Sequence, residues 1–186
     1  MFFRKTLKYH CVDYFMTSQV FFQIKELLDN NSVEYQHIVH EPVKTSKEAA
    51  DTRGFSLDDG AKALILKVQN KEGSNNENLN RTSSYSFIQC VISASQRIDL
   101  KKVKLLTVSK NVALASPEEV LEKTGCTIGS VPPFGILFGI KMYIDKSVLT
   151  REMIVFSAGT HTDSIRMKPQ DYIEIVGAEV VDIRKE

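Results

Sequence analysis

The chain has 186 residues, of which 42% are hydrophobic and 25% are charged, which is the composition of an ordinary folded domain rather than of a disordered or fibrous protein. A formal net charge of +1 excludes a strong overall field for nucleic acid or acidic membranes, although a local basic patch is compatible with it, and no apolar run is long enough to span a membrane. The four histidines and three cysteines (Cys11, Cys90 and Cys126) cluster neither as metal ligands nor as a disulfide framework, so we expect no metal, no cofactor and a reducing, cytoplasmic location.

The first fifteen residues, MFFRKTLKYHCVDYF, are basic and partly amphipathic. They lack the continuous apolar stretch and the small-residue cleavage site of a secretory signal. An organellar targeting segment and a working start at Met16 both stay open. The first clear helical pattern follows Met16, so we assign residues 1–16 to an N-terminal extension and residues 17–186 to a single domain.

The first half of that domain alternates helices and strands. Residues 18–29 repeat apolar side chains at helical spacing, and residues 33–40 alternate as a strand. Thr45 and Glu48 have the spacing of a capping box for a helix that Gly54 ends. Two apolar strands follow at 61–68 and 85–94. Between them lies a polar insert, residues 70–84, which has no apolar period and which we interpret as a disordered surface loop.

The second half mixes the same elements without a regular βαβ rhythm. We expect a short basic helix at 99–106, a strand at 111–116 and a helix at 116–125, where Ser116, Pro117 and Glu119 mark the start. Further strands are expected near 140–145, 153–157, 163–167 and 178–183, with a helix opened by Pro169 before the last one. The pattern predicts one mixed α/β or α+β domain around a mixed sheet.

No phosphate loop, nucleophile elbow or zinc-protease helix is present. Two features still point to chemistry. Lys62 interrupts the start of an apolar strand, where it is either a solvated strand end or a fixed cation for a phosphate or carboxylate. The segment GSVPPFG, residues 129–135, is either a rigid turn with positive φ at Gly129 or a backbone cradle for a small ligand.

Two further segments allow a structural and a functional interpretation. Ser157, Ala158 and Gly159 stand at a strand end and are followed by hydroxyl side chains and His161. Small residues permit close backbone approach, so this segment is either a plain turn or the wall of a ligand site. Thr45 is sufficiently explained as a helix cap, but it also closes the segment HEPVKT that precedes the helix.

Taken in order, the segments HEPVKTSKEAA, GAKALILK, LASPEEVLEKTGCTIGSVPPFG, YID and FSAG…SIRMKPQDY resemble the YbaK/prolyl-tRNA-synthetase-associated domain family of aminoacyl-tRNA deacylases. The resemblance runs from about residue 18 to the C-terminus, and the first fifteen residues and the insert lie outside it. It implies a largely antiparallel, barrel-like mixed sheet with flanking helices. It also implies a metal-independent, cytoplasmic hydrolase that edits mischarged tRNA, for example tRNA for proline, by binding its acceptor end. An aminoacyl-tRNA synthetase is an implied partner.

The family's site residues can be carried over one by one. Its lysine falls on Lys62 and its small-residue wall falls on Ser157, Ala158 and Gly159. Its histidine near that wall falls on His161, and Lys62, Ser157 and His161 are the expected catalytic positions. The substrate-binding positions that the resemblance implies are Thr45, Gly129, Ser130, Val131, Pro132, Pro133, Ala158 and Gly159.

Such a site needs no catalytic triad, because an aminoacyl ester is already activated. A positioned water, donors for the developing oxyanion and a well-oriented substrate suffice. Lys62 would anchor the terminal phosphate or steer the ester, and the 129–135 loop would hold the α-amino group through backbone carbonyls. Two alternatives stay open: a catalytically silent module of the same fold that binds tRNA or a synthetase, and an unrelated small-molecule binder.

Overall fold

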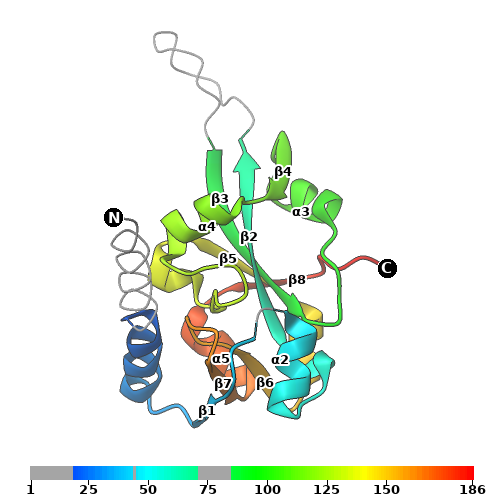
Figure 1. The fold of residues 1–186 in the computed structure, drawn as a ribbon. Helices are drawn as coiled ribbons and strands as arrows, with labels where there is room; N and C mark the ends of the chain where they lie inside the picture. Colours follow the sequence, from blue (N-terminus) through cyan, green and yellow to red (C-terminus); the bar gives the residue numbers. More distant parts are fainter. Residues whose placement is uncertain (1–18, 44, 71–84) are drawn as a thin grey trace, which may run out of the picture.

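The computed structural model describes residues 19–43, 45–70 and 85–186 (Figure 1). The expected N-terminal extension, Cys11 and the insert from residue 71 to residue 84 therefore lie outside the described residues. Within the described ranges, no helix combines the length and the apolar character that a membrane crossing requires.

The helices begin and end where the sequence signals predict. The first described helix covers residues 19–30 and buries Val20, Ile24 and Leu28, which lie on its apolar face. Helix α2 (Ser46–Arg53) has the predicted capping box at its N-terminus, and its C-cap glycine adopts a left-handed conformation with φ 70°. Helix α4 (Pro117–Thr124) has the second predicted capping box, with proline in its first turn. Helices α3 (Leu100–Leu106) and α5 (Pro169–Val176) also match their predicted segments.

The larger of two sheets has five strands in the order β4-β2-β3-β5-β8. Strands β2 (Ala61–Gln69) and β3 (Tyr85–Ser93) form a long antiparallel hairpin, and β4 (Asn111–Leu114) adds antiparallel to β2. Strands β5 (Lys141–Asp145) and β8 (Glu179–Val181) continue the sheet in parallel on the other side of β3. The sheet is therefore mixed, as the sequence predicts.

The smaller sheet has three antiparallel strands in the order β1-β7-β6: β1 (Tyr35–Val39), β7 (Asp163–Met167) and β6 (Ile154–Ser157). It lies beside α2 at one end of the long β2–β3 hairpin (Figure 1). A single bridge between Gly60 and Val155 joins the two sheets. This junction brings the start of β2 against the end of β6, and it places two predicted site segments side by side.

The main hydrophobic cluster fills the space between the two sheets and the helices. Phe134, Phe156 and Tyr172 form its aromatic centre, with ring centroids 5.5–6.0 Å apart, and all three side chains are fully buried. Phe134 follows directly on the double proline, and Phe156 precedes Ser157. The core therefore fixes the backbone of both segments from behind.

Three short 3₁₀ helices were not predicted: η1 (Leu57–Asp59), η2 (Gly135–Phe138) and η3 (Lys146–Thr150). Each begins or ends at a loop next to a strand, where only a few residues are available. Such short turns have no apolar period that a sequence window can detect.

Candidate functional site

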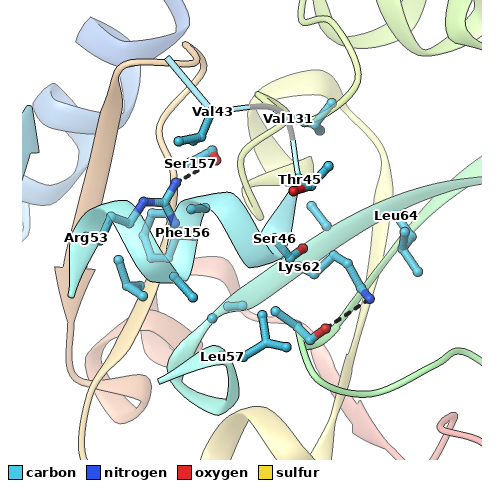
Figure 2. A pocket seen from close by; sticks show the side chains of 18 of the residues that line it. Val43, Thr45, Ser46, Arg53, Leu57, Lys62, Leu64, Val131, Phe156 and Ser157 are labelled. Atoms are coloured by element: carbon cyan, nitrogen blue, oxygen red, sulfur yellow. Dashed lines mark hydrogen bonds between the residues drawn. The ribbon is translucent and has the colours of Figure 1, made fainter. Parts of the chain in front are cut away.

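A cavity of about 260 Å³ opens between α2, the start of β2, the end of β6 and the loop at residues 128–131. Figure 2 shows side chains from these segments converging on it. Small apolar side chains form much of the wall, including Ala49, Ala50 and Ala63. The polar and charged side chains in the lining are Thr45, Ser46, Arg53, Ser56, Lys62 and Ser157.

Five predicted site residues line this cavity: Thr45, Lys62, Gly129, Val131 and Ser157. They come from four separate segments of the chain, and the fold brings them together as the resemblance implies. The other predicted residues are not part of the lining: Ser130, Pro132, Pro133, Ala158, Gly159 and His161.

Thr45 has the structural role that its spacing predicts. Its Oγ1 accepts a hydrogen bond from the backbone N–H of Glu48 at 3.2 Å, and its own N–H donates to a Glu48 carboxylate oxygen at 3.3 Å. The same residue lines the cavity. The cap and the cavity wall are therefore one piece of backbone, and the cap fixes where α2 meets the pocket.

Lys62 is held by carbonyl oxygens rather than by a carboxylate. Its Nζ donates to the carbonyl of Gln96 at 3.0 Å and to that of Ala94 at 3.4 Å. Burial, and then the positive charge of Arg97, lower the pKa of Lys62. An ammonium has three N–H donors. The two carbonyls therefore use two of these donors, and one donor is left for a ligand. Lys62 lines the cavity, and Figure 2 shows its side chain among the lining residues.

The floor of the cavity has no room for a larger residue at Gly60. A Cβ at this position would lie 2.7 Å from the Cβ of Ala94 and 3.2 Å from the carbonyl oxygen of Leu57. Gly60 also forms the bridge to Val155. A glycine is therefore needed here for the start of β2 to pack against Ala94 and η1.

Buried side chains hold the backbone of the 129–135 loop by hydrogen bonds from the interior of the protein. Gln89, which is 0% exposed on β3, donates from Nε2 to the carbonyl of Pro132 at 2.9 Å and accepts at Oε1 from the N–H of Gly135 at 2.8 Å. The buried hydroxyl of Tyr172 donates to the carbonyl of Pro133. The two proline carbonyls are thus engaged inside the protein.

The front of the loop faces the cavity. Gly129 has φ 93°, a left-handed conformation that favours glycine, and it lines the cavity together with Val131. Between them, buried Ser130 accepts a hydrogen bond at its carbonyl from the N–H of Gly159 at 3.1 Å. The two interpretations of Gly129 are therefore compatible, because the residue is both a turn residue with positive φ and part of the wall.

Ser157 exposes its side chain to the cavity, whereas the next two residues support it. Ala158 is fully buried and donates its N–H to the carbonyl of Asp163 at 2.9 Å. Gly159 has φ 90° and bonds to the 129–135 loop. This segment therefore joins the loop to the end of β6.

His161 links two segments of the chain by hydrogen bonds. Its Nδ1 lies 2.7 Å from the carbonyl oxygen of Val43, to which it donates, and its Nε2 accepts from the Thr127 hydroxyl at 2.9 Å. It connects the segment before α2 to the segment before Gly129. It does not line the cavity.

Arg53 is a pocket residue that sequence reasoning missed. It lies in the last turn of α2, where a basic residue interacts favourably with the helix dipole in many proteins. Its position in the sequence therefore did not indicate a functional residue. Gln89 was missed as well, although a polar residue inside the apolar run YSFIQCVIS is a usable signal for a buried clamp. In the described ranges, no group of three or more His, Cys, Asp or Glu side chains is arranged to hold a metal ion.

Comparisons with known proteins match the same region. The model of the aminoacyl-tRNA editing domain matches residues 40–175. The multifunctional Ser/Thr-tRNA deacylase ProXp-y of Escherichia coli (strain K12) is 32% identical over 160 residues, which cover 86% of this chain and 89% of that protein. A proline–tRNA ligase of Thermosipho melanesiensis is 26% identical over 124 residues, which cover 66% of this chain but 19% of the ligase.

Solved structures share the fold. A candidate trans-editing enzyme for prolyl-tRNA synthetase superposes with a TM-score of 0.69 at 25% identity, with 90% of this chain and 98% of that chain covered. A protein without an assigned function superposes with a TM-score of 0.74 at 24% identity, with 87% of this chain and 99% of that chain covered.

Proposed function

Because this chain belongs to the aminoacyl-tRNA editing domain family, we propose that it is an aminoacyl-tRNA deacylase whose reaction site is the cavity between α2 and the 129–135 loop. The observation that carries the proposal is the convergence of Thr45, Lys62, Gly129 and Ser157, from four segments, on one cavity. The reaction is hydrolysis of the ester between a wrong amino acid and the terminal adenosine of a tRNA.

Lys62 is the cation that receives the acceptor end. Its ammonium is held by two carbonyls, has no carboxylate partner within the described residues, lines the cavity and keeps one N–H for a ligand. A fixed ammonium of this kind suits a phosphate oxygen of the terminal nucleotide or the ester oxygen. Arg97 nearby adds to the positive potential that attracts the polynucleotide.

The 129–135 loop supplies the shape of the aminoacyl subsite. Gln89 and Tyr172 use the carbonyls of Pro132 and Pro133, so those two cannot hold the substrate's α-amino group. The part of the loop that faces the cavity is Gly129 and Val131. We therefore assign the contact with the aminoacyl group to the backbone of residues 129–131.

The substrate is a small amino acid. The E. coli relative at 32% identity is named for seryl- and threonyl-tRNA, and the cavity has a volume of about 260 Å³ that must accommodate the aminoacyl group and part of the ribose. Hydroxyl side chains at Thr45, Ser46 and Ser56 offer partners for a substrate hydroxyl. We propose seryl- and threonyl-tRNA as the preferred substrates.

The chain acts in trans on tRNA that a synthetase has released or is about to release. The related segment in the proline–tRNA ligase is 19% of that enzyme's length, which shows that such a segment can be carried within a synthetase. We propose that this chain works with a synthetase as a separate partner.

The purified chain should be tested against a panel of mischarged tRNAs that carry serine, threonine, alanine and a larger apolar residue. We expect hydrolysis of the seryl and threonyl esters, and Lys62→Met should lower kcat/KM by about 100-fold because it removes a charged donor at the reacting end. Lys67→Met is the matched control, since Lys67 lies on the same strand and pairs with Glu119 outside the cavity.

The control should keep its rate and a melting temperature close to that of the wild type, because an exposed ion pair contributes little to stability. Binding of tRNA without hydrolysis of any ester would refute the deacylase and leave the catalytically silent binding module. Equal losses in the Lys62 and Lys67 variants would refute the assignment of Lys62.

A further inference from the structure

The cavity wall contains a cation that the mechanism above does not use. Arg53 lines the cavity from the last turn of α2, and burial lowers the pKa of its guanidinium to about 10. It is therefore charged at neutral pH. Within the described residues Arg53 forms no ion pair with a carboxylate. Burying part of a charge without a counter-charge costs free energy, so the groups that hydrogen-bond to Arg53 must compensate for it.

The guanidinium is fixed by two neutral side chains. Its Nη2 donates to Ser157 Oγ at 3.1 Å and its Nε donates to His40 Nε2 at 3.3 Å. Figure 2 shows Arg53 reaching from α2 across to Ser157. His40 is itself oriented, because its Nδ1 lies 2.8 Å from the carbonyl oxygen of Glu41 and must donate to it.

His40 Nε2 is consequently an acceptor, and the Ser164 hydroxyl at 2.7 Å and Arg53 Nε at 3.3 Å share its one lone pair. Nε and Nη2 share one edge of the planar guanidinium, so His40 and Ser157 together hold that edge. The Glu41–His40 hydrogen bond sets the tautomer in which His40 can accept from Arg53.

The contact restricts the direction of the Ser157 hydroxyl. A guanidinium can only donate, so Arg53 occupies a lone pair of Oγ and the hydroxyl proton must point elsewhere. Within the described residues Ser157 Oγ makes no other hydrogen bond, and no imidazole or carboxylate contacts it. Because Ser157 lines the cavity, its proton is available to a ligand there. A charged donor on the oxygen also makes that O–H a stronger donor.

We propose that Arg53 is a positioning residue for the deacylation reaction and that it orients Ser157 to donate a hydrogen bond to the ester carbonyl oxygen. This inference rests on the proposed function. When the water oxygen bonds to the ester carbon, the π pair of the carbonyl moves onto its oxygen. The Ser157 O–H donates to that oxyanion. When the oxyanion collapses, the bond to the ribose oxygen breaks, and the ribose oxygen takes up the proton released by the water.

Ser157 is a donor in this scheme and not a nucleophile. A nucleophilic serine needs a neighbouring base to take its proton, and Arg53 is an acid at every working pH. No acyl-serine forms, and Ser157 is unchanged at the end of the reaction.

The test is a double-mutant cycle with Arg53→Gln, Ser157→Ala and the double variant, measured as single-turnover deacylation and as kcat and KM. Each single variant should lower kcat by about 100-fold, as loss of one oxyanion donor does, with little change in KM. The double variant should be no slower than the slower single variant, because both changes remove the same hydrogen bond. Arg53→Lys keeps the charge and should recover part of the rate.

Arg166→Gln is the matched control, since Arg166 stacks on Phe55 and does not line the cavity. It should keep the wild-type kcat. Melting temperatures of all variants separate folding from catalysis, and if Arg53→Gln does not fold, the cycle is run with Arg53→Met in its place.

Losses that multiply in the double variant would overturn the inference. A rise in KM for Arg53→Gln, together with a weaker dependence of KM on salt, would also overturn it, because Arg53 would then contact a tRNA phosphate directly. In both cases the wild type is active and the proposed function stands. A wild type that hydrolyses none of the mischarged tRNAs would overturn the proposed function, and the inference with it.

Discussion

Replacing Gln89 by methionine tests whether the shape of the 129–135 loop depends on one buried side chain. Methionine fills a similar volume but offers neither the amide donor nor the amide acceptor. The substitution leaves the carbonyl of Pro132 and the N–H of Gly135 without their partners, and both residues are buried. We therefore expect the loop to move away from its position beside the cavity.

The size of the effect follows from these two groups. A buried polar group that loses its partner costs about 1–3 kcal/mol, so the pair costs about 2–6 kcal/mol. The total stability of a domain is about 5–15 kcal/mol, so Gln89→Met removes a large part of it. Deacylation by the fraction that stays folded should also fall, because residues 129–131 face the cavity.

Urea unfolding followed by circular dichroism measures the loss of stability. Gln36→Met is the matched control, because Gln36 is exposed on β1 and should tolerate the change within about 0.5 kcal/mol. Gln89→Glu adds a second check: an ionised carboxylate repels the Pro132 carbonyl, and a protonated one can donate to it, so this variant should gain stability as the pH falls. Equal stability of the Gln89→Met and Gln36→Met variants would refute the clamp.

Three further predictions concern single residues. Burial alone would raise the pKa of Asp145, but hydrogen bonds from Ser147 and from two backbone N–H groups near the C-terminus outweigh burial and lower the pKa. The ionised Asp145 therefore stabilises the fold above the ordinary pKa of an aspartate, and this stabilisation is lost as the pH falls through the lowered pKa. Asp145→Asn should therefore lower the melting temperature at pH 7 and flatten its fall in acid. Gly129→Ala should cost about 1 kcal/mol or more in urea unfolding because φ is 93° there, and an unchanged midpoint would contradict this. Thr45→Ala and Ser116→Ala remove equivalent caps and should each cost about 1 kcal/mol, but only the Thr45 variant should slow deacylation, since Thr45 alone of the two lines the cavity.

Local sequence signals predicted the elements, and the family expectation is confirmed. Both capping boxes and the glycine stop after α2 occur where their spacing places them, because caps depend on residues three or four positions apart. The parallel pairing of β3, β5 and β8 could not be predicted in this way. Strand order depends on contacts between distant segments, and the apolar period of a strand is the same in parallel and antiparallel pairs.

The site was predicted in part for the same reason. Lys62 interrupts an apolar strand, and Gly129 belongs to a turn with an unusual composition. Both residues can therefore be recognised as candidates from the sequence. Arg53 breaks none, and its importance comes only from the fold that sets Ser157 and His40 beside it. His161 was expected at the reaction centre, and the structure places it between Val43 and Thr127 instead, where it makes two hydrogen bonds; its part in catalysis stays a prediction.

The pairing of β1 with β7 has a consequence for how this protein emerges during its own synthesis. His37 on β1 and Asp163 on β7 are hydrogen-bonded at 2.7 Å although they are 126 residues apart in the chain. At about 5–20 residues per second, the first strand waits about 6–25 s for its neighbour to be made. The cavity also needs Val155, Phe156 and Ser157, so a nascent chain has no complete site until most of it has been translated.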